Sequence, residues 1–183
     1  MRDVILYMSM SLDGLVASDR EHPGVAVADP EVKQWKLDRI SKAGAHLMGR
    51  ATYEEMSSYW PRSDDPYAGP MNDIPKIVFS KTLSDNEASW PVTRVARGDL
   101  ATEIAAIKAE PGPDVIVWGG AMLAGALAAA DVIDEYRLLV QPLVLGRGKA
   151  LFEQLPESRH LDLVEARPFP SGIVVQIYRP QRG

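Results

Sequence analysis

Apolar residues along the chain follow two patterns, short continuous runs and longer segments with helical spacing. The short runs predict strands at 4–9, 45–48, 76–80, 92–96 and 115–118. Apolar residues spaced by three or four positions predict helices that begin near Pro30, Arg50, Leu100 and Ala121. Strands that alternate with helices are typical of an α/β fold with a largely parallel sheet.

The last third of the chain has a different pattern. A strand-like segment, 135–145, is broken by Pro142, and two more strands are predicted at 161–166 and 173–178. The connection at 168–172 contains proline and glycine, which favours an antiparallel hairpin. We expect about eight strands and about four helices in one domain that spans the whole chain.

The composition excludes several classes of function. The 183 residues include 20 Lys and Arg against 25 Asp and Glu, a net charge of −5, so we expect no nucleic-acid partner. There is no cysteine and the three histidines are scattered, so we expect no metal site. The apolar runs are too short for a membrane span or a signal peptide, and we therefore expect a cytoplasmic protein.

Residues suited to phosphate binding follow three of the predicted strands. They are Gly49, Arg50 and Thr52, then Ser80 and Lys81, then Gly119, Gly120, Ala121 and Met122. Glycine lets a ligand approach the backbone, and a helix start offers free N–H groups to an anion. Each segment alone is also explained as a packing turn or a solvated loop. Because the carboxyl ends of parallel strands share one edge of a sheet, the three together indicate a long anionic ligand such as a dinucleotide.

Four segments, taken in order, resemble the dihydrofolate reductase superfamily. They are 10–17 (Met-Ser-Leu-Asp-Gly-Leu-Val-Ala), 47–54 (Leu-Met-Gly-Arg-Ala-Thr-Tyr-Glu), 116–121 (Ile-Val-Trp-Gly-Gly-Ala) and 133–152. The last segment and the Ser-Leu-Asp-Gly signature resemble more specifically the reductase domain of the bifunctional riboflavin-biosynthesis deaminase/reductase and its free-standing relatives. The resemblance implies a dihydrofolate reductase-like three-layer α/β fold, with a mostly parallel central sheet and an antiparallel C-terminal hairpin.

The resemblance also implies NADPH as the cofactor. It assigns Gly49, Arg50 and Thr52 to the cofactor phosphates, with Arg50 favouring the 2′-phosphate. It assigns Ser80 and Lys81 to the adenosine side, and Gly119 to Met122 to the turn under the pyrophosphate and nicotinamide. Ser9 and Val16 are assigned to the flanks of the nicotinamide ring. In these relatives the peptide between the two glycines is often cis.

The acidic residue of folate reductases, which lies on their first helix, has no clear counterpart here. Lys33 stands about where the spacing would put it, and Glu31 lies nearby. Asp29 and Glu31 are well explained as a helix cap and a first-turn acid. Asp13, after the first strand, is our candidate catalytic carboxylate, although an Asp-Gly turn explains it equally well.

The segments 18–28 and 61–75 are predicted to be loops that rim the substrate pocket. Aromatic residues that could stack on a planar ring are Trp35, Tyr59, Trp60 and Tyr67, of which Trp35 and Trp60 also fit an ordinary core by their helical spacing. Arg147 and Lys149 could hold an acidic substrate group or be solvated. We expect His46, in a short apolar strand, to be a hydrogen-bonded core residue.

The leading hypothesis is an NADPH-dependent reductase that transfers a hydride to a small heterocyclic or sugar-like substrate. The resemblance makes 5-amino-6-(5-phosphoribosylamino)uracil reductase of riboflavin biosynthesis the reference activity, and it implies a homodimer formed through the C-terminal strands. Two alternatives stay open. One is a true dihydrofolate reductase, and the other is a nucleotide-binding protein without turnover.

Overall fold

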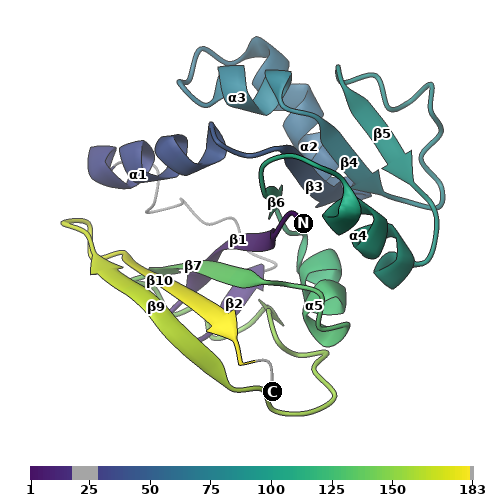
Figure 1. Ribbon diagram of the computed structural model, residues 1–183. Coiled ribbons are helices and arrows are strands. Elements are labelled where there is room, and N and C mark those ends of the chain that lie inside the picture. Colours follow the sequence, from purple (N-terminus) through teal and green to yellow (C-terminus); the bar gives the residue numbers. More distant parts are fainter. Residues whose placement is uncertain (18–28, 182–183) are drawn as a thin grey trace.

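A computed structural model describes residues 1–17 and 29–181, and its centre is an eight-stranded sheet (Figure 1). The order of strands across the sheet is β5-β4-β3-β6-β1-β7-β10-β9. Neighbours from β5 to β7 run parallel, and β10 and β9 add an antiparallel hairpin. Their bounds are β1 (Val4–Ser11), β3 (Ala45–Gly49), β4 (Lys76–Phe79), β5 (Thr93–Ala96), β6 (Val115–Val117), β7 (Glu135–Gln141), β9 (Leu161–Pro168) and β10 (Val174–Pro180).

Helices cover both faces of this sheet and produce three layers (Figure 1). They are α1 (Pro30–Ile40), α2 (Arg50–Tyr59), the short 3-10 helix η2 (Trp60–Arg62), α3 (Ala68–Asp73), α4 (Leu100–Ala109) and α5 (Ala121–Ala129). Alternate residues of a strand point to opposite faces, so Leu6 of β1 packs in the cluster that includes α4 and α5, whereas Tyr7 packs against α1. The predicted fold class, a dihydrofolate reductase-like three-layer α/β fold, is confirmed.

Helix α1 begins as the sequence predicts. The Asp29 carboxylate accepts hydrogen bonds from the backbone N–H groups of Glu31 and Val32, at 2.9 and 3.2 Å. Its other oxygen accepts the backbone N–H of Ser171 in the β9–β10 turn, at 3.1 Å, which ties the helix to the end of the sheet. Asp29 is therefore a buried helix cap, and Glu31 is exposed at the helix surface.

The prediction of a loop over 61–75 is wrong. This segment contains η2 and α3, and Tyr67 and Met71 within it are buried. Pro61 and Pro70 lie in the first turns of these helices, where a backbone N–H has no intrahelical partner to lose, so proline is tolerated. With α3, the described part of the chain has five α-helices where we expected about four.

A small two-stranded sheet was also missed. Strands β2 (Leu15–Ala17) and β8 (Lys149–Ala150) pair antiparallel, and each is too short to give a periodic signal. The predicted loop 18–28 lies outside the described residues. Within the residues that are described, no helix has the length and apolar character needed to cross a membrane.

Candidate functional site

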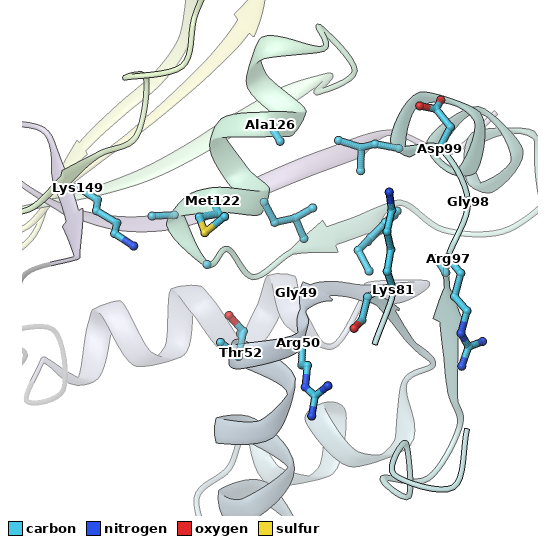
Figure 2. A pocket seen from close by; sticks show the side chains of 18 residues that line it. Gly49, Arg50, Thr52, Lys81, Arg97, Gly98, Asp99, Met122, Ala126 and Lys149 are labelled. Atoms are coloured by element: carbon cyan, nitrogen blue, oxygen red, sulfur yellow. The ribbon is translucent and has the colours of Figure 1, made fainter. Parts of the chain in front are cut away.

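A cleft of about 910 Å³ lies where the carboxyl ends of β3, β4, β5 and β6 meet the starts of α2, α4 and α5 (Figure 2). Its lining residues are Gly49, Arg50, Ala51, Thr52, Phe79, Ser80, Lys81, Ala96, Arg97, Gly98, Asp99, Leu100, Gly120, Ala121, Met122, Leu123, Ala126 and Lys149. Four of these side chains are cationic and one is acidic, although the chain as a whole carries a net charge of −5. The cleft is thus a local positive region suited to an anionic ligand.

The helix starts at this cleft differ in how their first amides are satisfied. Gly49 and Gly120 are the N-caps of α2 and α5, and glycine has no side chain that could accept from the first N–H groups. In α4, by contrast, the Asp99 carboxylate accepts the backbone N–H of Thr102 at 3.1 Å. The first amides of α2 and α5 therefore remain available to an anion, with the positive ends of both helix dipoles behind them.

The turn before α5 depends on two glycines. Gly119 and Gly120 have φ values of +78° and +62°, a region that residues with a Cβ rarely adopt. A Cβ at Gly120 would lie 3.3 Å from the Thr52 hydroxyl oxygen, so α2 and the turn approach closely across the cleft. The resemblance implies a cis peptide between the glycines, but this bond is trans here, and the two positive φ values make the turn instead.

The four cations of the cleft fall into two groups, with Arg50 and Arg97 paired to carboxylates and Lys81 and Lys149 unpaired among the described residues. The Arg50 Nε donates to Glu54 Oε1 at 2.7 Å, and its Nη1 donates to the Thr82 hydroxyl at 2.9 Å. The hydrogen bond to Glu54 raises the pKa of Arg50, with a smaller contribution from Glu87. Within the described residues, Lys81 and Lys149 have no such partners, and Figure 2 shows them extending into the cleft from opposite ends.

Most of the predicted cofactor residues come together in the cleft. Those that line it are Gly49, Arg50, Thr52, Ser80, Lys81, Gly120, Ala121 and Met122. Ser9, Val16 and Gly119 do not line it, and the roles assigned to all of these residues stay predictions.

The sequence reasoning missed one strand end in the cleft, residues 97–99 after β5. The sequence pattern predicted only a helix that begins near Leu100 there, although this strand–glycine–helix order repeats the one at Gly49. Lys149 was expected either to hold an acidic group of the substrate or to be solvated. The structure places it with the phosphate candidates because β8 pairs with β2 beside β1.

A second, smaller pocket of about 220 Å³ lies between α1, the end of α2 and α3. It is lined by Lys33, Lys36, Ile40, Tyr59, Trp60, Asp65, Tyr67, Met71 and Trp118. The predicted stacking residues Tyr59, Trp60 and Tyr67 are among them, whereas Trp35 is buried in the core beside Tyr7. We call this the small pocket. The two pockets are linked in sequence, because Trp118 of the small pocket is followed directly by the Gly119–Gly120 turn before α5.

Trp118, one wall of the small pocket, is held by His46. The indole Nε1–H of Trp118 donates to His46 Nδ1 at 2.9 Å. Because an indole nitrogen can only donate, the His46 proton lies on Nε2, which donates to the Pro70 carbonyl at 3.2 Å. Burial lowers the pKa of His46 to about 4. The prediction that His46 is a hydrogen-bonded core residue is confirmed.

Asp13, the candidate catalytic carboxylate, connects two distant parts of the chain. Its two oxygens accept the backbone N–H groups of Leu145 and Gly146, at 3.1 and 2.8 Å. Hydrogen bonds from Ser11 and from these two amides lower the pKa of Asp13 to about 2. The carboxylate is thus ionised at neutral pH, and its hydrogen bonds hold the loop after β7.

Replacing Asp13 tests this contact. In Asp13→Ala the two amides lose their acceptor, so their hydrogen–deuterium exchange is expected to quicken by about tenfold or more. The matched control is Leu12→Ala, which removes an exposed side chain from the same turn. Unchanged exchange at Leu145 and Gly146 in Asp13→Ala would contradict the contact.

The sequence profile of one protein family, the RibD C-terminal domain, matches residues 2–175, nearly the whole chain. The chain belongs to the RibD C-terminal domain family. This family is a reductase domain, which supports an oxidoreductase activity of the riboflavin-pathway type.

Relatives of known sequence and solved structures agree with this membership. Two uncharacterized proteins of Bacillus subtilis, YyaP and YwjB, are 29% and 30% identical to this chain; the alignments cover 97% of this chain in both cases, and 94% and 97% of those proteins. A putative riboflavin biosynthesis protein from Shewanella sp. PV-4 has a TM-score of 0.81 at 22% identity, covering 98% of this chain and 99% of that one.

Two further structures share the fold of this RibD C-terminal domain. The bifunctional deaminase/5-amino-6-(5-phosphoribosylamino)uracil reductase of Thermotoga maritima has a TM-score of 0.70 at 16% identity, covering 98% of this chain and 57% of that protein. A dihydrofolate reductase from Enterococcus faecalis, solved in complex with NADP(H), has a TM-score of 0.66 at 15% identity, covering 98% of this chain and 97% of that one. At these identities the likeness shows the fold alone.

Proposed function

We propose that this protein is an NADPH-dependent reductase that transfers a hydride to a small heterocyclic or sugar-like substrate, of the type reduced in riboflavin biosynthesis. The observation that carries the proposal is the positive cleft at the carboxyl ends of four parallel strands. Family membership supports the reductase class, and the NADP(H) complex of the Enterococcus faecalis enzyme supports the choice of cofactor.

The residues of the cleft fit a dinucleotide phosphate. Its volume of about 910 Å³ lies at the upper end of the roughly 300–1,000 Å³ typical of ligand pockets. The uncapped starts of α2 and α5 offer backbone N–H groups to a pyrophosphate. The glycines at both starts leave room for close approach, and Lys81 and Lys149 supply positive charge that no described carboxylate neutralises.

When bound, NADPH supplies the hydride, and the protein needs little chemistry of its own. The cleft residues bind and orient the cofactor. Among them, Gly120 at the start of α5 lies two residues after Trp118 of the small pocket. The aromatic walls of the small pocket hold the substrate ring and exclude water. Asp13 is proposed to act in positioning, because its oxygens hold the loop at 145–146.

Dihydrofolate reduction is less well supported. Glu31 is exposed at the start of α1. The side chain that enters the small pocket from this helix near the expected position is Lys33, which carries the opposite charge to the acid of folate reductases. A pterin would meet the Lys33–Asp65 ion pair where folate reductases present a carboxylate.

Titration of the purified protein with NADPH and NADH, followed by nucleotide fluorescence, tests the proposal. We expect micromolar binding of NADPH and weaker binding of NADH. In Arg50→Ala the preference for NADPH is expected to fall by about tenfold, since one charge-assisted contact to the 2′-phosphate is lost. The matched control, Lys42→Ala, removes an exposed cation after α1, outside the cleft.

Two results would point away from the reductase. If neither nucleotide binds, the reductase proposal is wrong and the fold serves another purpose. If NADPH binds but is oxidised by none of a panel that includes dihydrofolate and the ribosylamino-pyrimidine phosphate, the alternative of a nucleotide-binding protein without turnover is favoured.

The homodimer and the cytoplasmic location stay predictions. Strand β9 lies at an edge of the sheet, and it exposes Leu163 and Val164 there. An edge strand with exposed apolar side chains suits pairing with a second copy of the chain.

A further inference from the structure

Two lysines of α1 line the small pocket and differ in how their charges are balanced. The Lys33 Nζ lies 2.9 Å from Asp65 Oδ2, so this cation has its counter-ion. The Lys36 ammonium has neither a hydrogen bond nor an ion pair with any residue that the structure describes. It lies instead 5.8 Å from the centroid of the Tyr7 ring and 5.6 Å from that of the Tyr67 ring.

Among the described residues, the surroundings compensate the positive charge of Lys36 only in part. Burial lowers the pKa of Lys36; the nearby Asp65 opposes this effect, and Lys33 reinforces it. Burial raises the pKa of Tyr67 to about 12 and that of Tyr7 well above its usual value, so neither phenol supplies a negative charge. Attraction to the two rings offsets only part of the cost of desolvating a cation.

A second polar group beside Lys36 also lacks a partner. The Tyr7 hydroxyl is buried, and no group in the described ranges forms a hydrogen bond with it. Buried hydroxyl groups are normally bonded in native proteins, so an unbonded one is informative. The Tyr7 ring lies 5.4 Å from that of Trp118, which places this hydroxyl-bearing residue against a wall of the small pocket.

The walls of the small pocket favour a flat ligand. Tyr59 and Trp60 pack edge to face with centroids 4.8 Å apart, and Trp60 and Tyr67 do so at 6.2 Å. Mutual edge-to-face packing fixes the orientation of the rings. The volume of about 220 Å³ is below the usual range for ligand pockets, which limits the occupant to one or two fused rings.

We propose that the small pocket binds a flat compound of one or two fused rings that carries an anionic oxygen group such as a carboxylate, and that the Lys36 ammonium binds this group. The inference rests on the proposed function, since it names the class of substrate of the same site. Lys36 is then the specificity-determining residue, and the paired Lys33 is not. The anion supplies the direct counter-ion that Lys36 lacks among the described residues.

Calorimetric titration with 2-naphthoate and its uncharged analogue 2-naphthamide, both without NADPH, tests the inference. These probes share a flat two-ring frame and differ in charge. The wild-type protein is expected to bind 2-naphthoate at least about tenfold more tightly than 2-naphthamide. In Lys36→Met, which keeps the apolar stem, this preference is expected to fall to about twofold or less, and in Lys36→Arg it is expected to persist.

Lys42→Met, at an exposed lysine after α1 that does not line the small pocket, is the matched control and is expected to keep the preference. Thermal melting verifies that each variant is folded, and Lys36→Gln replaces Lys36→Met if the latter is not. A folded Lys36→Met or Lys36→Gln protein that retains the full preference overturns the inference. So does a wild-type protein that binds NADPH but neither naphthalene compound. A protein that prefers 2-naphthoate through Lys36 yet binds no nucleotide would instead contradict the proposed reductase and leave this inference standing.

Discussion

Lowering the pH from 6.5 to 4 is expected to remove about 3 kcal/mol of stability through His46 alone. His46 is fully buried, and burial lowers its pKa to about 4, whereas the unfolded chain has a histidine pKa of about 6.5. The unfolded state therefore binds the proton first as the pH falls. Stability from this group is complete above pH 6.5, declines through this window and is lost below pH 4.

Urea unfolding of the wild type and of His46→Asn across this range measures the effect. Asn keeps an acceptor near the Trp118 indole but does not titrate, so the wild type is expected to be more stable at pH 7. The difference in unfolding free energy should shrink by about 3 kcal/mol at pH 4. The exposed His160 provides the control, because His160→Asn removes a histidine without touching the core. Parallel pH profiles of the wild type and His46→Asn would show that His46 is not buried in the neutral form.

Gly120→Ala is expected to damage both the fold and the cofactor site. An alanine at φ +62° is strained by roughly 1–3 kcal/mol, and its Cβ would lie 3.3 Å from the Thr52 hydroxyl. The new methyl group also stands at the uncapped start of α5, between the helix amides and the cleft. We expect a lower melting temperature and an NADPH affinity reduced by about tenfold or more.

The matched control is Gly69→Ala in α3. A Cβ at Gly69 has no heavy atom within 4 Å, and alanine favours the helix by up to about 1 kcal/mol. This variant should melt at or above the wild-type temperature and bind NADPH unchanged. If Gly120→Ala binds NADPH as tightly as the wild type while Gly69→Ala behaves as described, the phosphate contacts do not involve the start of α5.

Local sequence patterns determined the order and type of most elements. Continuous apolar runs predicted the parallel strands, and Asp29 followed by Pro30 predicted the start of α1, because capping depends on neighbours within three residues. The phosphate candidates were found for a related reason. The carboxyl ends of parallel strands must share one edge of a sheet, so the sequence predicts that Gly49, Ser80 and Gly120 lie together, and all three line the cleft.

Local sequence patterns gave wrong predictions where turn-forming residues competed with buried apolar ones, and where a strand was too short to show a period. Proline and aspartate in 61–75 indicated a loop, but burial of Tyr67 and Met71 against α1 and α2 organises the segment into helices. Lys149 looked like part of a solvated loop, since a strand of two residues has no period to detect. Its place in the cleft depends on pairing with a strand more than a hundred residues earlier.

The sequence by itself determined the fold class, the family and the positive edge of the sheet, because each depends on residues close together in the chain or on the order of such segments. Only the tertiary structure decided which charged and polar groups form ion pairs or hydrogen bonds with one another. Asp65 pairs with Lys33, and Lys36 has no counter-ion among the described residues. His46 bonds Trp118, 72 positions away, and Asp13 bonds Leu145, 132 positions away. Hydrogen bonds form only between atoms in close contact, and Coulomb attraction weakens as the separation grows, so both depend on distances in space that no spacing along the chain encodes.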